Sequence, residues 1–247
     1  MKYLYVSSIL LVLTLLTGSN SKEFNYLPAS VSNHQIVSYT QFTLSYNEHH
    51  EQANWVAYEL TRAEVIMKQK RCNCFRSDKN IITGSASTGD YSSSGYDRGH
   101  LSPAADNNMS SIANRESFLM SNMSPQLPNF NRSIWKTLES WTRERASIYG
   151  TVYIVTGPVF KDNMGVIGKN NVTVPGYYYK AILRSEISTH YTIAFLIPQL
   201  YVSKEITDYI LTIDSLEIIT GIDFFPALED LVENKVEANS DIENWTL

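Results

Sequence analysis

The side chains best suited to chemistry fall in two short segments, an Asp-Arg-Gly-His tetrapeptide that ends at His100 and a second segment that begins at Asn131. On an extended backbone Arg98 and His100 are two residues apart and project to the same side. On a helical backbone Asn131 and Glu139 lie about 12 Å apart along the axis and roughly 80° apart in rotation, so both can border one cleft. An imidazole, a guanidinium, an amide oxygen and a carboxylate around one cleft indicate metal-assisted hydrolysis of a phosphodiester.

A strand and an amphipathic helix must hold these groups. The helix is predicted over residues 131–146, because its apolar residues form one stripe; these are Ile134, Trp135, Leu138, Trp141 and Thr142. Segments rich in β-branched and aromatic residues predict strands at 152–155, 172–174, 178–183 and 191–197, and residues 54–60 are expected to form a strand or a short helix in the core. The fold class is therefore expected to be α+β, a central antiparallel sheet with packed helices and the site on one side.

The charge of the chain is unevenly distributed. The formal net charge is −5, but residues 203–247 contain eleven acidic and two basic residues. Within the remainder, a basic cluster comprises Lys68, Lys70, Arg71, Arg76 and Lys79. Because a local basic surface is enough to attract phosphate, the acidic total does not exclude a nucleic acid partner.

Three regions are expected along the chain. Residues 1–21 have one lysine, an uncharged apolar run and then small residues, the pattern of a secretory signal peptide. Residues 22–231 form the catalytic domain. Residues 232–247 are acidic, lack a sustained apolar pattern and are expected to be a mobile tail. Because of the signal peptide, the protein is predicted to be secreted or periplasmic.

Cys72 and Cys74 are the only cysteines. With a single residue between them, the two cysteines are not expected to form an easy disulfide, and the pair is interpreted as two cysteines of a loop without a role in catalysis. A strained local bridge stays open as an alternative in an oxidising compartment.

Three ordered blocks between residues 96 and 139 resemble the DNA/RNA non-specific endonucleases, the family with a ββα-metal finger that includes secreted bacterial nucleases and mitochondrial endonuclease G. The blocks are YDRGHLSPAAD at 96–106, FLMSNMSPQ at 118–126 and N-x3-W-x2-LE at 131–139. The likeness extends to NWVAY at 54–58, TGP at 156–158, VP at 174–175 with Lys180, and residues 216–224. It covers roughly residues 50–226.

The resemblance implies a catalytic role for three of these residues. His100 is the general base that takes a proton from the attacking water. Asn131 binds a divalent metal through its amide oxygen, with Mg²⁺ expected and Mn²⁺ as an alternative. Glu139 accepts hydrogen bonds from waters bound to that metal.

Four further residues are assigned supporting roles by the same resemblance. Arg71 matches an upstream arginine that steadies the pentacovalent phosphate, and Arg76 is the alternative for that position. Arg98 contacts a neighbouring phosphate or supports the site. Asn122 orients His100 or the metal shell.

The function expected from these features is that of a secreted, Mg²⁺-dependent endonuclease that cleaves DNA and RNA without sequence specificity and leaves 5′-phosphate ends. No recognition helix or basic arm is evident, so contacts are expected to phosphates and not to bases. Two alternatives remain: a catalytically silent nucleic-acid-binding protein of the same fold, and a phosphodiesterase for small or lipid substrates. An inhibitor protein or a homodimer partner is left open.

Overall fold

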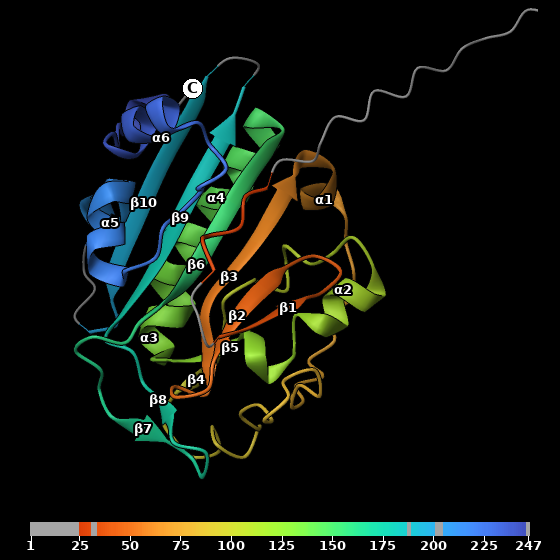
Figure 1. Ribbon diagram of the computed structural model, residues 1–247. Helices are drawn as coiled ribbons and strands as arrows, with labels where there is room; N and C mark the ends of the chain where they lie inside the picture. Colours follow the sequence, from red (N-terminus) through yellow and green to blue (C-terminus); the bar gives the residue numbers. More distant parts are fainter. Residues whose placement is uncertain (1–24, 31–33, 187–188, 201–204, 246–247) are drawn as a thin grey trace, which may run out of the picture.

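The computed structural model describes residues 25–30, 34–186, 189–200 and 205–245, and the predicted signal peptide lies outside these ranges. Its centre is a seven-stranded sheet with the order β1-β2-β3-β6-β9-β10-β11, in which all neighbouring strands are antiparallel (Figure 1). Two further pairs, β4-β5 and β7-β8, lie outside this sheet. The expected α+β class with a central antiparallel sheet is confirmed.

The strands have the following bounds: β1 (Gln35–Ser38), β2 (Thr43–Asn47), β3 (Gln52–Thr61), β4 (Asp97–His100), β5 (Met123–Gln126), β6 (Thr151–Val159), β7 (Val166–Ile167), β8 (Val172–Thr173), β9 (Tyr177–Ser185), β10 (His190–Pro198) and β11 (Ile210–Leu211). The α-helices are α1 (Arg62–Ile66), α2 (Ser111–Glu116), α3 (Pro128–Phe130), α4 (Lys136–Tyr149), α5 (Ile213–Thr220) and α6 (Asp230–Glu237). Short helical turns complete the description: η1 (Met120–Asn122), the π-helical η2 (Asn131–Trp135), η3 (Ile206–Tyr209) and η4 (Ile242–Trp245).

Side chains that alternate along the strands build a core on each face of the sheet. On β9, Tyr178 and Ile182 belong to the core that includes Trp135 and Leu138, next to α4. Tyr179 and its same-side neighbours on β9 belong to a second core with α5 and residues 222–228. The molecule therefore has three layers, with the sheet between α4 on one side and α5 on the other (Figure 1).

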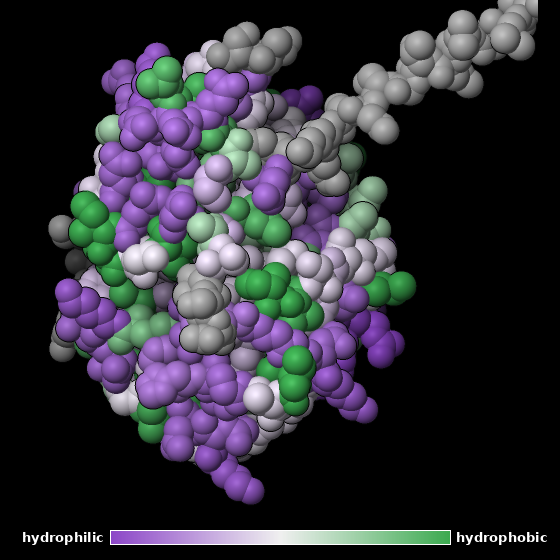
Figure 2. All heavy atoms as spheres, in the orientation of Figure 1, coloured by the Kyte–Doolittle hydropathy of each residue, from purple (hydrophilic) through white to green (hydrophobic). Residues whose placement is uncertain are grey.

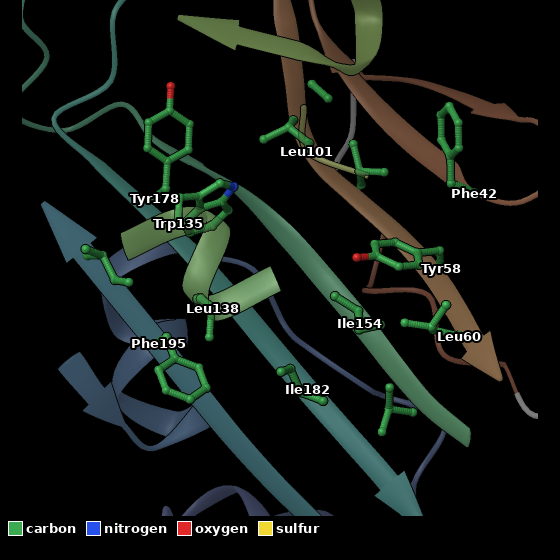
Figure 3. Close-up of a cluster of buried hydrophobic side chains, with 14 of the residues drawn as sticks. Phe42, Tyr58, Leu60, Leu101, Trp135, Leu138, Ile154, Tyr178, Ile182 and Phe195 are labelled. Atoms are coloured by element: carbon green, nitrogen blue, oxygen red, sulfur yellow. The ribbon is translucent and has the colours of Figure 1, made fainter. Parts of the chain in front are cut away.

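The predicted apolar stripe of the long helix is the surface that meets the sheet. Trp135 and Leu138 are fully buried, and Figure 3 shows them beside Tyr178, Ile182 and Phe195 of the sheet. The Trp135 and Tyr178 rings are 5.7 Å apart, and the Trp141 ring contacts Phe195 edge to face at 5.3 Å. Because this face of the helix packs on the sheet, the polar side chains of the other face are the ones available to the site.

The helix itself differs from the prediction at its start. Helical backbone begins at Pro128, and residues 131–135 form a π-helical turn before α4 continues to Tyr149. A π-helical turn holds more residues than an α-helical turn, so the ideal rotation between Asn131 and Glu139 does not apply. Asn131 is the first residue of the π-helical turn, so the irregular backbone begins at the residue that starts the third motif block.

The segment that carries the motifs is one insertion between two neighbouring strands. β3 and β6 pair in register from Val56 with Thr156 to Thr61 with Thr151, and Arg62 N–H donates to Gly150 O at 2.7 Å. Buried residues of this segment that pack on the sheet, among them Leu101, Phe130 and Leu138, belong to the core on the α4 side. The order of hairpin and helix in this insertion is the expected ββα arrangement.

The C-terminal region is more ordered than predicted. Residues 230–237 form α6, and η4 follows with Trp245, which is 0% exposed. The expectation of a mobile tail is therefore wrong for the described residues up to 245. Acidic residues dominate the composition, but one buried aromatic side chain and the Arg145 contact to Trp245 O are enough to fix the segment on the core.

The exposed hydrophobic side chains do not form one continuous area in the view of Figure 2, where several separate hydrophobic patches lie among hydrophilic residues. In the part of the chain that the structure describes, no helix combines the length and the apolar character needed to span a membrane.

Replacing Trp245 with alanine should lower the free energy of unfolding by about 3–5 kcal/mol, because it empties a fully enclosed site between α4 and the sheet. Leu231→Ala is the control, since Leu231 is 87% exposed on α6 and its loss should change stability by at most about 0.5 kcal/mol. Urea unfolding followed by circular dichroism measures both. Equal stability of Trp245→Ala and wild type would show that the C-terminal segment is not part of the folded core.

Candidate active site

A pocket of about 500 Å³ lies between β4, the loop that follows β4, the loop that carries Arg71 and the first turns of the long helix. It is lined by Arg71, Arg98, His100, Pro103, Ala104, Ala105, Asn131, Arg132, Lys136, Glu139 and Arg143. Five of the seven predicted site residues are thus brought together. Arg76 and Asn122 are the two that do not line the pocket.

His100 stands at the end of β4, where its backbone pairs with Met123 of β5. Gly99 is required beside it, because a Cβ at this position would lie 2.2 Å from the buried Gln126 side chain. The imidazole meets the rings of Phe118 at 4.9 Å and Phe75 at 5.7 Å, both edge to face. Its Nε2 atom has no hydrogen-bond partner.

The imidazole of His100 is held neutral. Burial, followed by the positive charges of Arg71 and Arg98, lowers the pKa of His100 to about 3. A neutral ring has one nitrogen with a free lone pair, so it can accept a proton from a group bound in the pocket.

Asp97 connects the hairpin to the helix. Its carboxylate accepts a hydrogen bond from Asn131 Nδ2 at 2.9 Å and two from Arg132, from Nε at 2.9 Å and from Nη2 at 2.6 Å. These contacts hold the pKa of Asp97 below its usual value against the effect of burial. Because the amide nitrogen of Asn131 is engaged by Asp97, its amide oxygen is the atom left for a ligand.

Buried charges lie beneath the pocket. Asp106 accepts hydrogen bonds from Arg143 Nη1 at 2.7 Å and from the Tyr58 hydroxyl at 2.9 Å. Burial and the nearby Asp106 carboxylate raise the pKa of Glu139, while Lys180, Arg143 and Arg71 oppose that shift. Lys180 is fully buried, and its Nζ lies over the Trp135 ring at 5.1 Å without a hydrogen-bond partner.

Arg71 reaches the pocket from a loop that the cysteines shape. Cys72 and Cys74 are joined by a disulfide bond, which corrects the expectation of two separate thiols. The bridge forms because Asn73 between the two cysteines has φ +50°, a left-handed conformation that asparagine tolerates, and the two Cα atoms come within 5.1 Å. Asn73 Oδ1 in turn accepts a hydrogen bond from Arg71 Nε at 2.9 Å.

Of the other two predicted arginines, Arg98 lines the pocket and Arg76 does not. Arg98 is exposed at the pocket edge, with its guanidinium carbon 4.2 Å from the centre of the Phe75 ring. Arg76 Nη1 donates to Arg115 O at 2.8 Å and does not line the pocket. The alternative in which Arg76 replaces Arg71 at the phosphate is therefore not supported by its position.

Asn122 braces the backbone after His100. Its Oδ1 accepts from Ser102 N–H at 2.9 Å, and its Nδ2 donates to Ser102 O at 2.9 Å and Ser117 O at 2.8 Å. The side chain is fully buried and contacts neither the imidazole nor the pocket. Its hydrogen bonds fix the loop that leaves β4, and its role in orienting His100 or the metal shell stays a prediction.

Sequence reasoning missed the charges that surround the predicted residues. Arg132, Lys136 and Arg143 line the pocket, and Asp106 and Lys180 lie beneath it. Arg143 follows Glu139 by four residues, a helical spacing that places both on one face and could have identified it. Lys180 comes from β9, far away in the sequence, so no local spacing identifies it; only its place in the family resemblance could have pointed to it.

Residues 20–231 match the family described as DNA/RNA non-specific endonuclease. A nuclease from Nostoc sp. is 34% identical over 213 residues, which are 81% of this chain and 77% of the relative. The chain belongs to the DNA/RNA non-specific endonuclease family, and is by that membership an endonuclease.

Mitochondrial proteins are among its relatives. The human nuclease EXOG is 34% identical over 209 residues, which cover 77% of this chain and 57% of that protein. Bovine endonuclease G is 30% identical over 207 residues, with 78% and 69% covered. The match therefore spans little more than half of the human nuclease EXOG.

A solved structure of a complex between EndoG and EndoGI, described as showing the mechanism of EndoG inhibition, shares the fold. It superposes with a TM-score of 0.75 at 29% sequence identity and covers 80% of this chain and 88% of that one.

The neutral state of His100 predicts a pH-dependent contribution to stability. The unfolded chain binds a proton on this histidine below its ordinary pKa of 6.5, whereas the folded chain does not until about pH 3. Stability is therefore lost as the pH falls between these values, by at most about 1.4 kcal/mol per pH unit. His100→Phe keeps a ring in the aromatic site and removes this proton.

Thermal unfolding of wild type and His100→Phe from pH 8 to pH 4.5 measures the effect. The variant should gain stability relative to wild type as the pH falls, with the difference at pH 8 as the reference. A difference that stays constant over this range would show that His100 titrates alike in the folded and unfolded chains.

Proposed function

We propose that the protein is a secreted, magnesium-dependent endonuclease that hydrolyses DNA and RNA without sequence specificity, with His100 as general base. The observation that carries the proposal is the neutral imidazole of His100 at a pocket lined by five basic side chains. Family membership supports the phosphodiester as the bond attacked.

The pocket residues fit a magnesium ion that keeps most of its water. Asn131 offers an amide oxygen and Glu139 a carboxylate in the same pocket. Among the described residues, no group of three ligating His, Cys, Asp or Glu side chains lies there, so a dedicated protein cage is not built. Magnesium prefers oxygen ligands and retains waters, which suits this donor set. When bound, the ion would polarise a phosphoryl oxygen and neutralise charge on the leaving oxygen.

His100 does the proton transfer in this proposal. Its neutral ring accepts a proton from water positioned against the phosphate. The positive charges of Arg71 and Arg98, which lower its pKa in the free protein, are themselves countered once a phosphate dianion or monoanion occupies the pocket. The base therefore becomes stronger when the substrate is bound than it is in the empty pocket.

The basic side chains hold the substrate through its backbone. Arg71 and Arg98 approach from the loop and hairpin side, and Arg132, Lys136 and Arg143 come from the helix. Guanidinium groups bind phosphate oxygens in pairs, and such contacts carry no sequence information. Recognition of this kind does not distinguish DNA from RNA, and departure of the 3′-oxygen leaves 5′-phosphate ends.

Digestion of supercoiled plasmid and total RNA, with Mg²⁺ or EDTA, tests the function. Wild type should degrade both substrates only with the metal, and His100→Ala should be slower by about 10²–10⁴-fold, the usual contribution of a general base. His49→Ala is the matched control, since His49 is exposed in the turn between β2 and β3 and lies outside the pocket.

Three results would contradict the proposal. Unchanged digestion by His100→Ala would remove the assignment of the base. Binding of DNA without cleavage would indicate a nucleic-acid-binding protein, and hydrolysis of bis-p-nitrophenyl phosphate alone would indicate a small-molecule phosphodiesterase.

Export is the part of the proposal that rests on the N-terminal sequence. The apolar run of residues 1–21 supports it, and a disulfide such as Cys72–Cys74 persists best in an oxidising compartment. The relatives named mitochondrial favour the competing destination. The mature N-terminus, read by mass spectrometry from fractionated cells and medium, should begin near residue 22 outside the cytosol. An uncleaved chain, or one recovered from an organelle, would overturn the export proposal.

A further inference from the structure

Three carboxylates meet on the opposite side of the sheet from α4. Asp214 and Glu217 come from α5 and Glu237 is the last residue of α6, and one oxygen of each lies within 4.8 Å of the others. No ion pair found among the described residues involves any of the three. Asp223 and Glu233 add further negative charge nearby.

Glu237 is the carboxylate of the three that has a buried oxygen without a hydrogen-bond partner. Its residue is 4% exposed, and its Oε1 atom is buried without a hydrogen-bond partner. It also ends α6, where the helix dipole disfavours a negative charge. A buried carboxylate without a partner is costly, so this side chain points to a missing positive group.

We propose that Asp214, Glu217 and Glu237 bind a calcium ion that fastens α6 to α5. Calcium accepts six to eight oxygens at about 2.3–2.6 Å, so two ligand oxygens on opposite sides of the ion are about 4.6–5.2 Å apart. The three carboxylate oxygens lie within 4.8 Å of one another, so one calcium ion can contact all three. Magnesium is usually held by one or two carboxylates and retains several waters, so a set of three carboxylates favours calcium.

The partial exposure of the cluster gives the ion an entry path. Asp214 is exposed and Glu217 half-buried, while Glu237 forms the inner wall. Glu217 Oε1 already accepts a hydrogen bond from Phe224 N–H at 2.7 Å, which orients its carboxylate. The ion then joins two helices that otherwise repel each other, and the C-terminal segment with Trp245 follows directly from the helix it secures.

Thermal unfolding of the full chain in EDTA or in CaCl₂ tests the site. The experiment uses the Asn131→Ala background, which removes the amide oxygen proposed to bind metal in the catalytic pocket. Calcium at a hundredfold its dissociation constant should raise Tm by about 5–10 °C. Equilibrium dialysis with ⁴⁵Ca²⁺ should find one ion per chain.

Two substitutions on the same helix separate the site from general charge effects. Glu237→Gln should abolish both the Tm shift and the bound ion, and in EDTA it should be at least as stable as its parent because the unpaired charge is gone. Glu233→Gln removes an equal charge from α6 without removing a ligand, so it should retain the shift. If Glu237→Gln fails to fold, Asp214→Asn, at an exposed position, replaces it.

The outcomes against the proposal are distinct. A Tm that calcium leaves unchanged, or that calcium raises equally in Glu237→Gln, overturns it. A further contrary outcome combines two results: calcium leaves the Tm unchanged, and the Tm in EDTA rises as the pH is lowered from 8 to 5. In that case a proton bound by the carboxylates, and not a calcium ion, supplies the missing positive charge. Failure of the nuclease proposal leaves this site unaffected, since its readouts are ion binding and stability.

Discussion

The carboxylate of Asp97 is the contact on which the geometry of the site depends. It lies on β4, three residues before His100, and it accepts hydrogen bonds from both Asn131 and Arg132 of the π-helical turn. These hydrogen bonds join the β4-β5 pair directly to the start of the long helix at the pocket. One carboxylate, 19% exposed, therefore sets the position of the imidazole relative to the amide oxygen.

Buried apolar and charged side chains lie beneath the polar groups of the site, next to the sheet. Trp135 and Leu138 anchor the helix from below, and the aromatic rings of Phe75 and Phe118 enclose the imidazole. Beneath the helix, Asp106 and Arg143 pair in a buried position next to Glu139 and Lys180. The low dielectric of this layer strengthens the fields that act on the pocket, which is why the pKa of His100 moves down and that of Glu139 moves up.

Much of this arrangement was accessible from the sequence because it depends on local patterns. The apolar stripe from Ile134 to Thr142 predicted the buried face of the helix, and β-branched runs predicted the strands of an antiparallel sheet. The spacing of the three motif blocks placed His100, Asn131 and Glu139 in one pocket, as the structure also does.

What the sequence did not reveal depends on single conformations or distant contacts. The disulfide exists because Asn73 turns the backbone, and no periodicity predicts one positive φ. The π-helical turn is an exception to the helical period that the prediction used. Lys180 reaches Glu139 only after β9 has been placed in the sheet, and Trp245 docks although its neighbours are acidic.

The pairing of Thr61 with Thr151 closes the whole catalytic segment between two adjacent residues of the sheet. Such a closure has a consequence for the order of folding. Bringing β3 and β6 together closes a long loop, and the entropy lost in this closure opposes the pairing until the strand contacts have formed. On a ribosome, β3 emerges long before its partner β6 and waits with an unpaired edge while the site is synthesised. The active site is thus made before the sheet that supports it can close, which makes the emerging chain dependent on local helices and hairpins until residue 151 arrives.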